Sequence, residues 1–263
     1  MVEPLVSIVV PVFRDRQQLD AVLASVAPTP DAELIVATAS DADNQDLGEL
    51  ASKYPAVRWV DAPQGRGPQM NHGARIARGR WLLFLHADTR LSDGWLDEVR
   101  AADQAGAIGG SFAFRLDSSR RAARVIEWGV ALRVRWLGLA YGDQAQFVRR
   151  DVFDRLAGFR LLPLMEDVDF IRRLKREGPL WHSRVPAQSS ARRWDRDGWV
   201  RRSLENIWLV LWFWAGGSPD RLARRYYRGE AGWTHAKVGS TAGAGPMPLV
   251  PHREDGRDTD QGR

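Results

Sequence analysis

Short apolar runs rich in β-branched residues alternate with amphipathic stretches, and this alternation constrains the fold more than any other feature of the chain. The runs lie at 6–12, 32–37, 57–60 and 81–86. Runs of this length predict strands, and the stretches between them predict helices. Leu19, Val22 and Leu23, for example, fall on one helical face. The sequence therefore predicts an α/β fold with a Rossmann-like, mostly parallel central sheet and helices on both faces.

The pattern changes in the second half of the chain. A strand is predicted at 107–116, a basic helix at 119–137 and another strand at 146–150. Because these segments do not alternate regularly, we expect a mixed C-terminal half. Ligands bind beyond the carboxyl ends of parallel strands, so the chemistry is expected at that edge of the sheet.

The length of 263 residues suits one domain. We expect this domain to span 1–237, with helices beginning at Pro68 and at Asp167 or Asp169. Residues 238–263 are rich in Gly, Pro, Asp and Arg, which predicts a disordered C-terminal tail.

Charge and cysteine content narrow the partners and the compartment. The net charge of +5 suits nucleic acid, an acidic membrane or a phosphorylated substrate, although the excess of arginine over lysine also fits a bias of genome composition. The chain has no cysteine, so it has neither a disulfide nor a thiolate metal site. Its first apolar run is short and stops at Pro11, which predicts a strand rather than a secretion signal. These features predict a cytoplasmic protein.

The first candidate site is the polar end of the run at 81–86. This run ends at His86 and is followed by Ala87 and Asp88. A carboxylate there suits a divalent cation, Mn²⁺ or Mg²⁺, that keeps open positions for substrate phosphates. His86 is a second candidate ligand. The alternative is that Asp88 only caps the following turn.

A glycine- and arginine-containing turn at 65–73 precedes that strand. Gly65 and Arg66 stand at a predicted helix start, where the backbone can approach a phosphate or a sugar closely. The segment matches neither the Walker nor the dinucleotide fingerprint, so an ordinary loop is the alternative.

Carboxylates crowd the segment 164–170. Glu166, Asp167 and Asp169 lie at a predicted helix start, where one of them is suited to act as a general base toward an acceptor hydroxyl. The helix dipole also stabilises negative charge at this position, so a solvated cap is the alternative.

Two turns carry weaker candidates. Gly142 and Asp143 lie at a turn before a predicted strand, and Arg192, Arg193 and Trp194 lie beyond the core. Paired arginines neutralise a departing diphosphate, and a tryptophan stacks on a sugar face. An ordinary basic surface loop is the alternative.

The apolar segment 207–214, IWLVLWFW, is too short to span a bilayer as a helix. Its tryptophans and the neighbouring arginines are typical of a helix that lies in a membrane interface. A helical segment at about 198–228 is therefore expected either to lie on the inner face of the membrane or to pack onto the domain. A lipid-linked acceptor would favour the first.

Five segments, taken in order, resemble the family 2 glycosyltransferases. They are VSIVVPVF, GRGPQMNHGARIARG, FLHADT, GDQAQFVRRDVFDRLAGF and PLMEDVDFIRRL. The similarity covers about residues 5–225 and looks closest to a small soluble bacterial subgroup with HADT at the metal site. It implies a GT-A fold, a nucleotide-diphosphate sugar donor, a hydroxyl acceptor, a divalent cation, and inversion at the anomeric carbon in one displacement.

The resemblance also assigns roles by position. Asp167 would be the general base, and Asp88 would hold the metal together with His86. The donor would contact Pro11, Val12, Phe13, Thr38, Gly65, Arg66, Gln69, Asn71, His86, Ala87 and Arg193. The acceptor would be bordered by Gly142, Asp143, Glu166 and Trp194.

Two positions depart from the family pattern. Thr38 stands where the family usually has an aspartate that ends the second strand and contacts the base, and Asp41 or Asp43 are the alternatives nearby. His86 stands where many relatives have a first acidic metal ligand. The sequence therefore leaves open which base the enzyme prefers and whether the chain is an inactive member of the family.

Two other functions compete with sugar transfer. A sugar nucleotidyltransferase shares the topology but has a glycine-rich, arginine-containing loop after the first strand, where this chain reads PVFRDRQQ. A noncatalytic binder of polyanions or membrane surfaces is favoured by the charge and by the arginine and tryptophan segments. We expect the glycosyltransferase, with no nucleic-acid partner.

Overall fold

The computed structural model describes residues 3–13, 15–26, 29–39 and 47–227. Asp41, Asp43 and the predicted tail at 238–263 lie outside the described residues. The strands of the described part are β1 (Val6–Val12), β2 (Ala32–Ala39), β3 (Arg58–Ala62), β4 (Trp81–Phe84), β5 (Thr89–Leu91), β6 (Gly109–Leu116), β7 (Phe147–Arg149) and β8 (Leu180–Ser189). Its helices are α1 (Arg16–Ser25), α2 (Leu47–Lys53), α3 (Arg66–Ile76), α4 (Trp95–Gln104), α5 (Arg121–Leu137), the 3-10 helix η1 (Gly142–Gln144), α6 (Arg150–Arg155), α7 (Glu166–Glu177), α8 (Arg192–Asp197), α9 (Trp199–Trp214) and α10 (Pro219–Tyr226).

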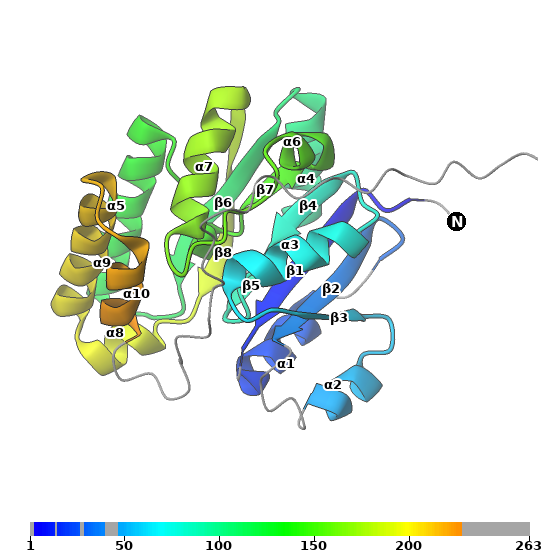
Figure 1. The fold of residues 1–263 in the computed structure, drawn as a ribbon, viewed down its shortest axis with the longest axis horizontal. Coiled ribbons are helices and arrows are strands. Elements are labelled where there is room, and N and C mark those ends of the chain that lie inside the picture. The colour runs from blue at the N-terminus through cyan, green and yellow to red at the C-terminus, as the bar shows by residue number, and fades with distance from the viewer. Residues whose placement is uncertain (1–2, 14, 27–28, 40–46, 228–263) are drawn as a thin grey trace, which may run out of the picture.

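The described strands form one eight-stranded sheet in the order β3-β2-β1-β4-β7-β6-β8-β5 (Figure 1). The four strands β3, β2, β1 and β4 are parallel. Strand β7 runs antiparallel to both β4 and β6, β8 is parallel to β6, and β5 is antiparallel to β8. The prediction of a Rossmann-like parallel half that continues into a mixed half is confirmed.

The sequence pattern misses two strands and misplaces two helix starts. Strand β5 has only three residues, and β8 is half-buried and contains Pro186, so neither forms a continuous apolar run. Helix α3 begins at Arg66 rather than at Pro68, directly after Gly65, which has a φ of 125°. Helix α7 begins at Glu166, one residue before the predicted Asp167, directly after Met165, which has a φ of 70°.

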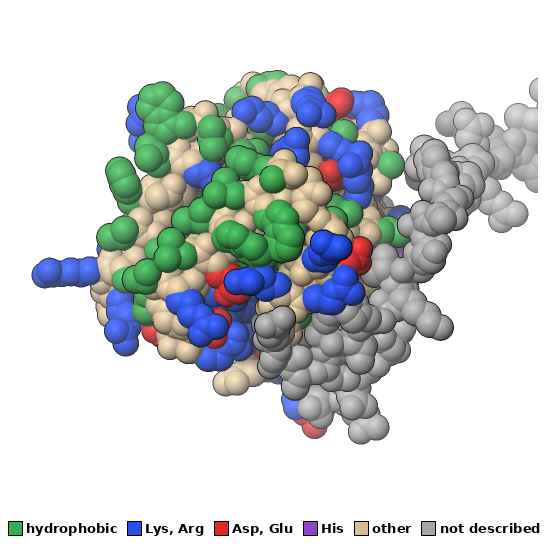
Figure 2. Space-filling model, turned by 60° about the vertical axis from the view of Figure 1, so that its left-hand side comes forward, with side chains coloured by type: hydrophobic (Ala, Val, Ile, Leu, Met, Phe, Trp, Pro, Cys, Tyr) green, Lys and Arg blue, Asp and Glu red, His purple; other side chains and the backbone are tan. Residues whose placement is uncertain are grey.

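Helices α5, α8, α9 and α10 lie at one flank of the molecule, beyond β6 and β8 (Figure 1). Helix α5 buries Ala123 in a cluster with Phe114 of β6, against which Trp194 and Trp199 also pack. Helices α9 and α10 bury Leu209 and Leu222 in a second cluster with the residues that begin α7. Figure 2 looks toward this flank. Within the described residues, no helix has the length and apolarity needed to cross a bilayer.

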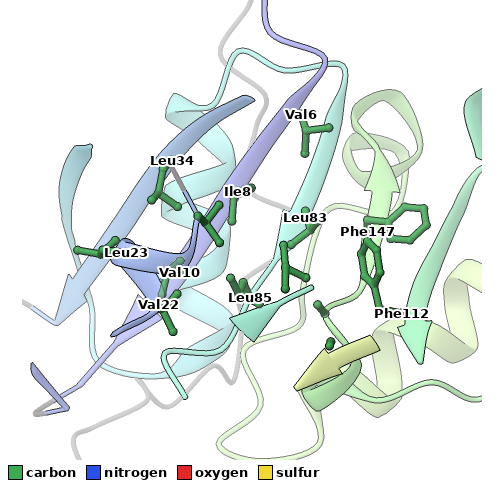
Figure 3. Close-up of a cluster of buried hydrophobic side chains, with 14 of the residues drawn as sticks. Val6, Ile8, Val10, Val22, Leu23, Leu34, Leu83, Leu85, Phe112 and Phe147 are labelled. Carbon is green, nitrogen blue, oxygen red and sulfur yellow. The ribbon is translucent and has the colours of Figure 1, made fainter. Parts of the chain in front are cut away.

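The core lies on both faces of the sheet because successive side chains of a strand point to opposite sides. Ile8 and Val10 of β1 face α1, where they meet Val22 and Leu23 (Figure 3). Val9 faces the other side, in the cluster that includes Met70 of α3. Uninterrupted apolar strands follow from this two-sided burial.

Helix α3 lies unusually close to β1. A Cβ atom at Gly73 would lie 2.3 Å from Val9 Cγ1, which is closer than side-chain atoms pack. Glycine at this position lets the helix settle on the strand. The close packing sets the position of Arg66 to Asn71, in the first turns of α3, above the sheet.

Candidate active site

The carboxyl ends of the parallel strands meet at one edge of the sheet. This edge collects Val12 from β1, Thr38 from β2, Asp61 from β3 and the residues after β4, which include His86 and Asp88. The edge is where open α/β sheets bind ligands. The structure therefore brings the predicted nucleoside residues Pro11, Val12 and Phe13 to the same edge as the predicted metal residues.

Gln69 ties the first two strands together. Its buried side-chain amide donates hydrogen bonds of 2.7 Å to the backbone oxygens of both Val12 and Ala37. Asn71 likewise donates to Phe159 O at 2.8 Å and accepts from Phe159 N at 2.9 Å. Gln69 and Asn71, both predicted to contact the sugar donor, thus make these side-chain hydrogen bonds inside the protein. The bonds position α3 and the loop after α6.

Thr38 is paired with the neighbouring strand. It lies opposite Asp61 in the β2–β3 register, and its hydroxyl donates to Asp61 Oδ1 at 2.5 Å. Thr38 is buried, whereas Asp61 is exposed. A carboxylate therefore stands beside the position where the resemblance expects one, on the next strand. The segment VRWVDA carries the signal for it, because Asp61 is the acid at the end of that run.

His86, Gly142 and Asp167 form the centre of the site. A Cβ atom at Gly142 would lie 2.6 Å from His86 Nε2 and 3.0 Å from Asp167 Oδ2. The imidazole and the carboxylate thus approach one glycine closely, although they are far apart in the sequence. Burial lowers the pKa of His86 to about 4, with Arg66 adding to the shift, so the ring is neutral at pH 7.

Asp167 is oriented by the backbone. Its Oδ2 accepts a hydrogen bond of 2.7 Å from Gly142 N, and its Oδ1 accepts one of 2.8 Å from Val168 N. The residue lies in the first turn of α7, where the helix dipole favours negative charge. A carboxylate held in this way has lone pairs left to accept a proton.

Asp143 is the least satisfied acid of the site. Among the described residues, its buried Oδ1 finds no hydrogen-bond partner. Burial raises the pKa of Asp143 to about 6, with Asp167 and Asp88 adding to the shift and Arg133 opposing it. The loop thus brings an additional carboxyl group close to Asp167 and Asp88.

Glu166 and Arg66 form a buried ion pair across the site. Arg66 Nε lies 2.7 Å from Glu166 Oε1, Arg66 Nη2 donates a hydrogen bond of 3.4 Å to Glu166 Oε2, and the glutamate side chain is fully buried. Burial raises the pKa of Glu166 to about 7 in spite of the opposing effect of Arg66. The pair links the start of α3 to the start of α7, and so joins the predicted donor and acceptor sides.

Asp88, a predicted metal ligand, is partly exposed. Its side chain is 26% exposed, and Arg192 Nη2 lies 3.8 Å from its Oδ2. Arg192 also pairs with Asp15 at the start of α1. The described residues contain no cluster of three or more His, Asp or Glu that could hold a metal ion. A cation here would therefore have at most Asp88 and the neutral imidazole of His86 as protein ligands and would take its remaining ligands from a substrate diphosphate.

The segment that begins α8 is divided between the site and the flank. Arg193 donates to the hydroxyl of Tyr226 and influences the pKa of His86, which places it on the site side. Trp194 packs against Phe114 at 6.4 Å between ring centroids, and its indole N–H donates to Ser203 at 3.3 Å. The tryptophan therefore stabilises the flank.

Three residues that the sequence does not single out also surround the site. Arg133 of α5 stacks on the ring of Tyr141 at 3.7 Å and donates to Gln144 Oε1 at 3.1 Å. Burial raises the pKa of Tyr141 to about 12, and it has the same effect on Tyr227, which lies near Arg66 and Glu166. No local pattern marks these residues, because they come from segments that only the fold brings together.

Comparison with known proteins identifies the family of this chain. Residues 7–164 match the family described as "Glycosyl transferase family 2". The PGL/p-HBAD biosynthesis glycosyltransferase of Mycobacterium bovis is 33% identical over 97 residues, which is 35% of this chain and 38% of that protein. An uncharacterized protein of Mycobacterium tuberculosis, MT1568, is 25% identical over 117 residues, which is 43% of this chain and 37% of that protein.

Solved structures share the fold. The 1–349 fragment of S. aureus TarS in complex with UDP-GlcNAc has a TM-score of 0.55 and 15% identity, and the match covers 70% of this chain and 58% of that one. Another structure of the same fragment has a TM-score of 0.54 and 13% identity, and covers 86% of this chain and 72% of that one. The chain therefore has a GT-A fold, with its candidate site at the carboxyl ends of the parallel strands. It belongs to the family 2 glycosyltransferases.

Proposed function

We propose that this enzyme transfers a sugar from a nucleotide-diphosphate sugar to a hydroxyl acceptor, with inversion at the anomeric carbon and Asp167 as the general base. The observation that carries the proposal is the carboxylate of Asp167, which two backbone N–H groups orient beside His86. Family membership supports sugar transfer over the nucleotidyltransferase and the noncatalytic binder.

The proposed reaction is a single displacement. Asp167 accepts the proton of the acceptor hydroxyl as the acceptor oxygen forms its bond to the anomeric carbon. The bond from that carbon to the diphosphate oxygen breaks, and its electron pair leaves with the diphosphate. Arg66 and Arg193 are proposed to balance the negative charge of the departing diphosphate. A divalent cation, held by Asp88 with His86, would neutralise the diphosphate when bound.

The remaining donor residues are proposed to act in two ways. Pro11, Val12 and Phe13 line the nucleoside pocket, and Gly65 and Ala87 let the donor approach the backbone. Gln69 and Asn71 position these segments through the bonds described above.

We propose that Asp61 supplies the carboxylate that reads the base, since Thr38 holds it at 2.5 Å. The imino and amino groups of uracil or guanine are donors that a carboxylate accepts from. The TarS neighbour holds UDP-GlcNAc, which makes a UDP-sugar the first donor to test.

The acceptor is proposed to lie between η1 and α7. Gly142, Asp143 and Glu166 border this space, and Trp194 supports it from the flank. We propose a lipid-linked acceptor, used by a peripheral enzyme at the cytoplasmic face of a membrane; the exposed tryptophans of α9, Trp208 and Trp214, support this class.

Calorimetric titration with UDP and GDP, each with Mn²⁺ and with a chelator, tests the donor site. We expect cation-dependent binding that Asp88→Ala abolishes and that Asp61→Asn weakens about tenfold or more, as for one charged hydrogen bond. Cation-dependent binding that survives in Asp88→Ala would move the metal elsewhere. An unchanged affinity in Asp61→Asn would remove this residue from the base contact.

A further inference from the structure

Exposed apolar side chains are concentrated on two helices. Among the described residues, twelve large apolar side chains are exposed, and all but Leu161 belong to α5 or α9. A soluble surface normally carries such residues singly, so a concentration of this kind marks a binding surface.

On α5 the exposed residues form one stripe. Val125, Trp128, Leu132 and Trp136 follow one another at intervals of three or four residues, which places them on one helical face. The two tryptophans are 68% and 73% exposed. The opposite face of α5 packs onto β6 through Ala123.

Helix α9 carries a matching stripe. Val200, Leu204, Ile207, Trp208, Leu211 and Trp214 are exposed and again follow helical spacing. Helix α9 is buried on its other side through Leu209. Both helices also contact the cluster of Phe114 and Leu116, α5 through Ile126 and α9 through Trp199. The stripes thus belong to one flank, and Figure 2 shows apolar side chains gathered across the side that carries it, with basic side chains beside them.

Helix α5 and the segment that contains α9 and α10 hold the positive charge of the protein. Residues 121–137 contain four arginines and one acid, and residues 199–226 contain five arginines and two acids, so each segment has a net charge of +3. The whole chain has a net charge of +5, which leaves the rest of the chain at −1. The basicity is therefore a property of this flank rather than of the composition as a whole.

We propose that the exposed faces of α5 and α9 together form a docking surface for an anionic lipid bilayer. Apolar side chains enter the acyl boundary, tryptophans prefer the headgroup level, and arginines pair with anionic headgroups. A second copy of this chain fits less well, because a symmetric contact would bring the basic segments 121–137 and 199–226 against the same basic segments of the other copy. The surface also adjoins the site, since α9 and α10 pack on Leu164 and Val168 around the start of α7.

Sedimentation of the full chain with phospholipid vesicles tests this surface without any sugar transfer. We expect binding to vesicles that contain phosphatidylglycerol, much weaker binding to phosphatidylcholine alone, and release at high salt. Two double variants, Trp128→Gln with Trp136→Gln on α5 and Leu204→Gln with Leu211→Gln on α9, are each expected to lose binding about tenfold or more. Arg135→Glu with Arg201→Glu is expected to abolish the preference for anionic lipid.

Matched controls lie outside the surface. Leu161→Gln removes the one exposed large apolar side chain elsewhere, and Arg75→Glu reverses an exposed charge on α3. Both are expected to leave vesicle binding unchanged, and circular dichroism checks that every variant is folded. The proposal would be overturned if the controls lost vesicle binding as much as the double variants, or if only the α9 variant lost it. It would also be overturned if the protein bound no vesicles and instead formed a dimer that the variants dissociate. Nucleotide titration of the same variants reports separately on the donor site.

Discussion

The parallel and mixed halves of the sheet differ in how their buried polar side chains are hydrogen-bonded. In the parallel half, the buried polar residues are paired, as where Ser7 donates to Glu33 at 2.6 Å and Gln69 joins two strands, although the indole nitrogen of Trp59 has no partner among the described residues. In the mixed half, Asp143 and Glu166 are buried with raised pKa values, and one oxygen of Asp143 has no partner among the described residues. The first half is a hydrogen-bonded platform, and the second concentrates the electrostatic cost at the place where chemistry is proposed.

The substitution Asp167→Asn is expected to have the largest effect on catalysis. Loss of the proposed base should reduce transfer about a thousandfold, while nucleotide affinity stays unchanged because the donor does not need a base to bind. Transfer assays and calorimetry on the same preparation measure both. Equal loss of affinity and rate would place Asp167 in donor binding.

The substitution Gly142→Ala is expected to come next. The new methyl group would press on His86 Nε2 and Asp167 Oδ2, so the centre of the site must shift. We expect transfer to fall about a hundredfold, because small displacements of reacting groups are costly. Gly48→Ala in α2, where nothing lies within 4 Å of a new Cβ, is the control and should leave transfer unchanged. Similar losses in both variants would contradict the role of Gly142.

The buried acids predict a pH dependence of stability. The folded pKa values of Asp143 and Glu166, about 6 and about 7, lie above their usual values of 3.8 and 4.5. The folded state thus holds protons that the unfolded state releases, so the free energy of unfolding should fall as the pH rises from about 4 to about 7. In Asp143→Asn, the free energy of unfolding should fall by about 2 kcal/mol less over this pH range than in the unsubstituted protein. Denaturant unfolding in the presence of a chelator measures this difference. A parallel pH profile in the variant would remove Asp143 as its source.

The platform is tested by Gln69→Leu. This change leaves Val12 O and Ala37 O without their side-chain donor, and we expect a loss of about 1–3 kcal/mol of unfolding free energy. Denaturant unfolding measures it. Because the loss acts through β1 and β2, nucleotide affinity should also fall. The pH dependence of stability should stay nearly unchanged. A stable variant with much weaker nucleotide binding would instead favour direct contact between Gln69 and the donor.

The two halves also differ in how far the sequence predicts them. Strands β1, β2 and β4 are buried on both faces, and the apolar runs at 6–12, 32–37 and 81–86 report this directly. Strand β8 is half-buried and polar in places, so its pairing with β6 is visible only in the structure. The internal hydrogen bonds of Gln69 and Asn71 are likewise visible only in the structure, since an amide in a motif looks identical whether it binds a ligand or a carbonyl.

The sequence by itself determined the α/β class, the order of the motifs and the residue types needed for sugar transfer, because these depend on local periodicity and on chemistry carried by single side chains. Only the tertiary structure decided that His86 and Asp167 meet at Gly142, that Asp61 stands beside Thr38, and that α5 and α9 share one apolar flank. Distances between remote segments and the burial that shifts a pKa arise from packing of the whole chain, which no local pattern encodes.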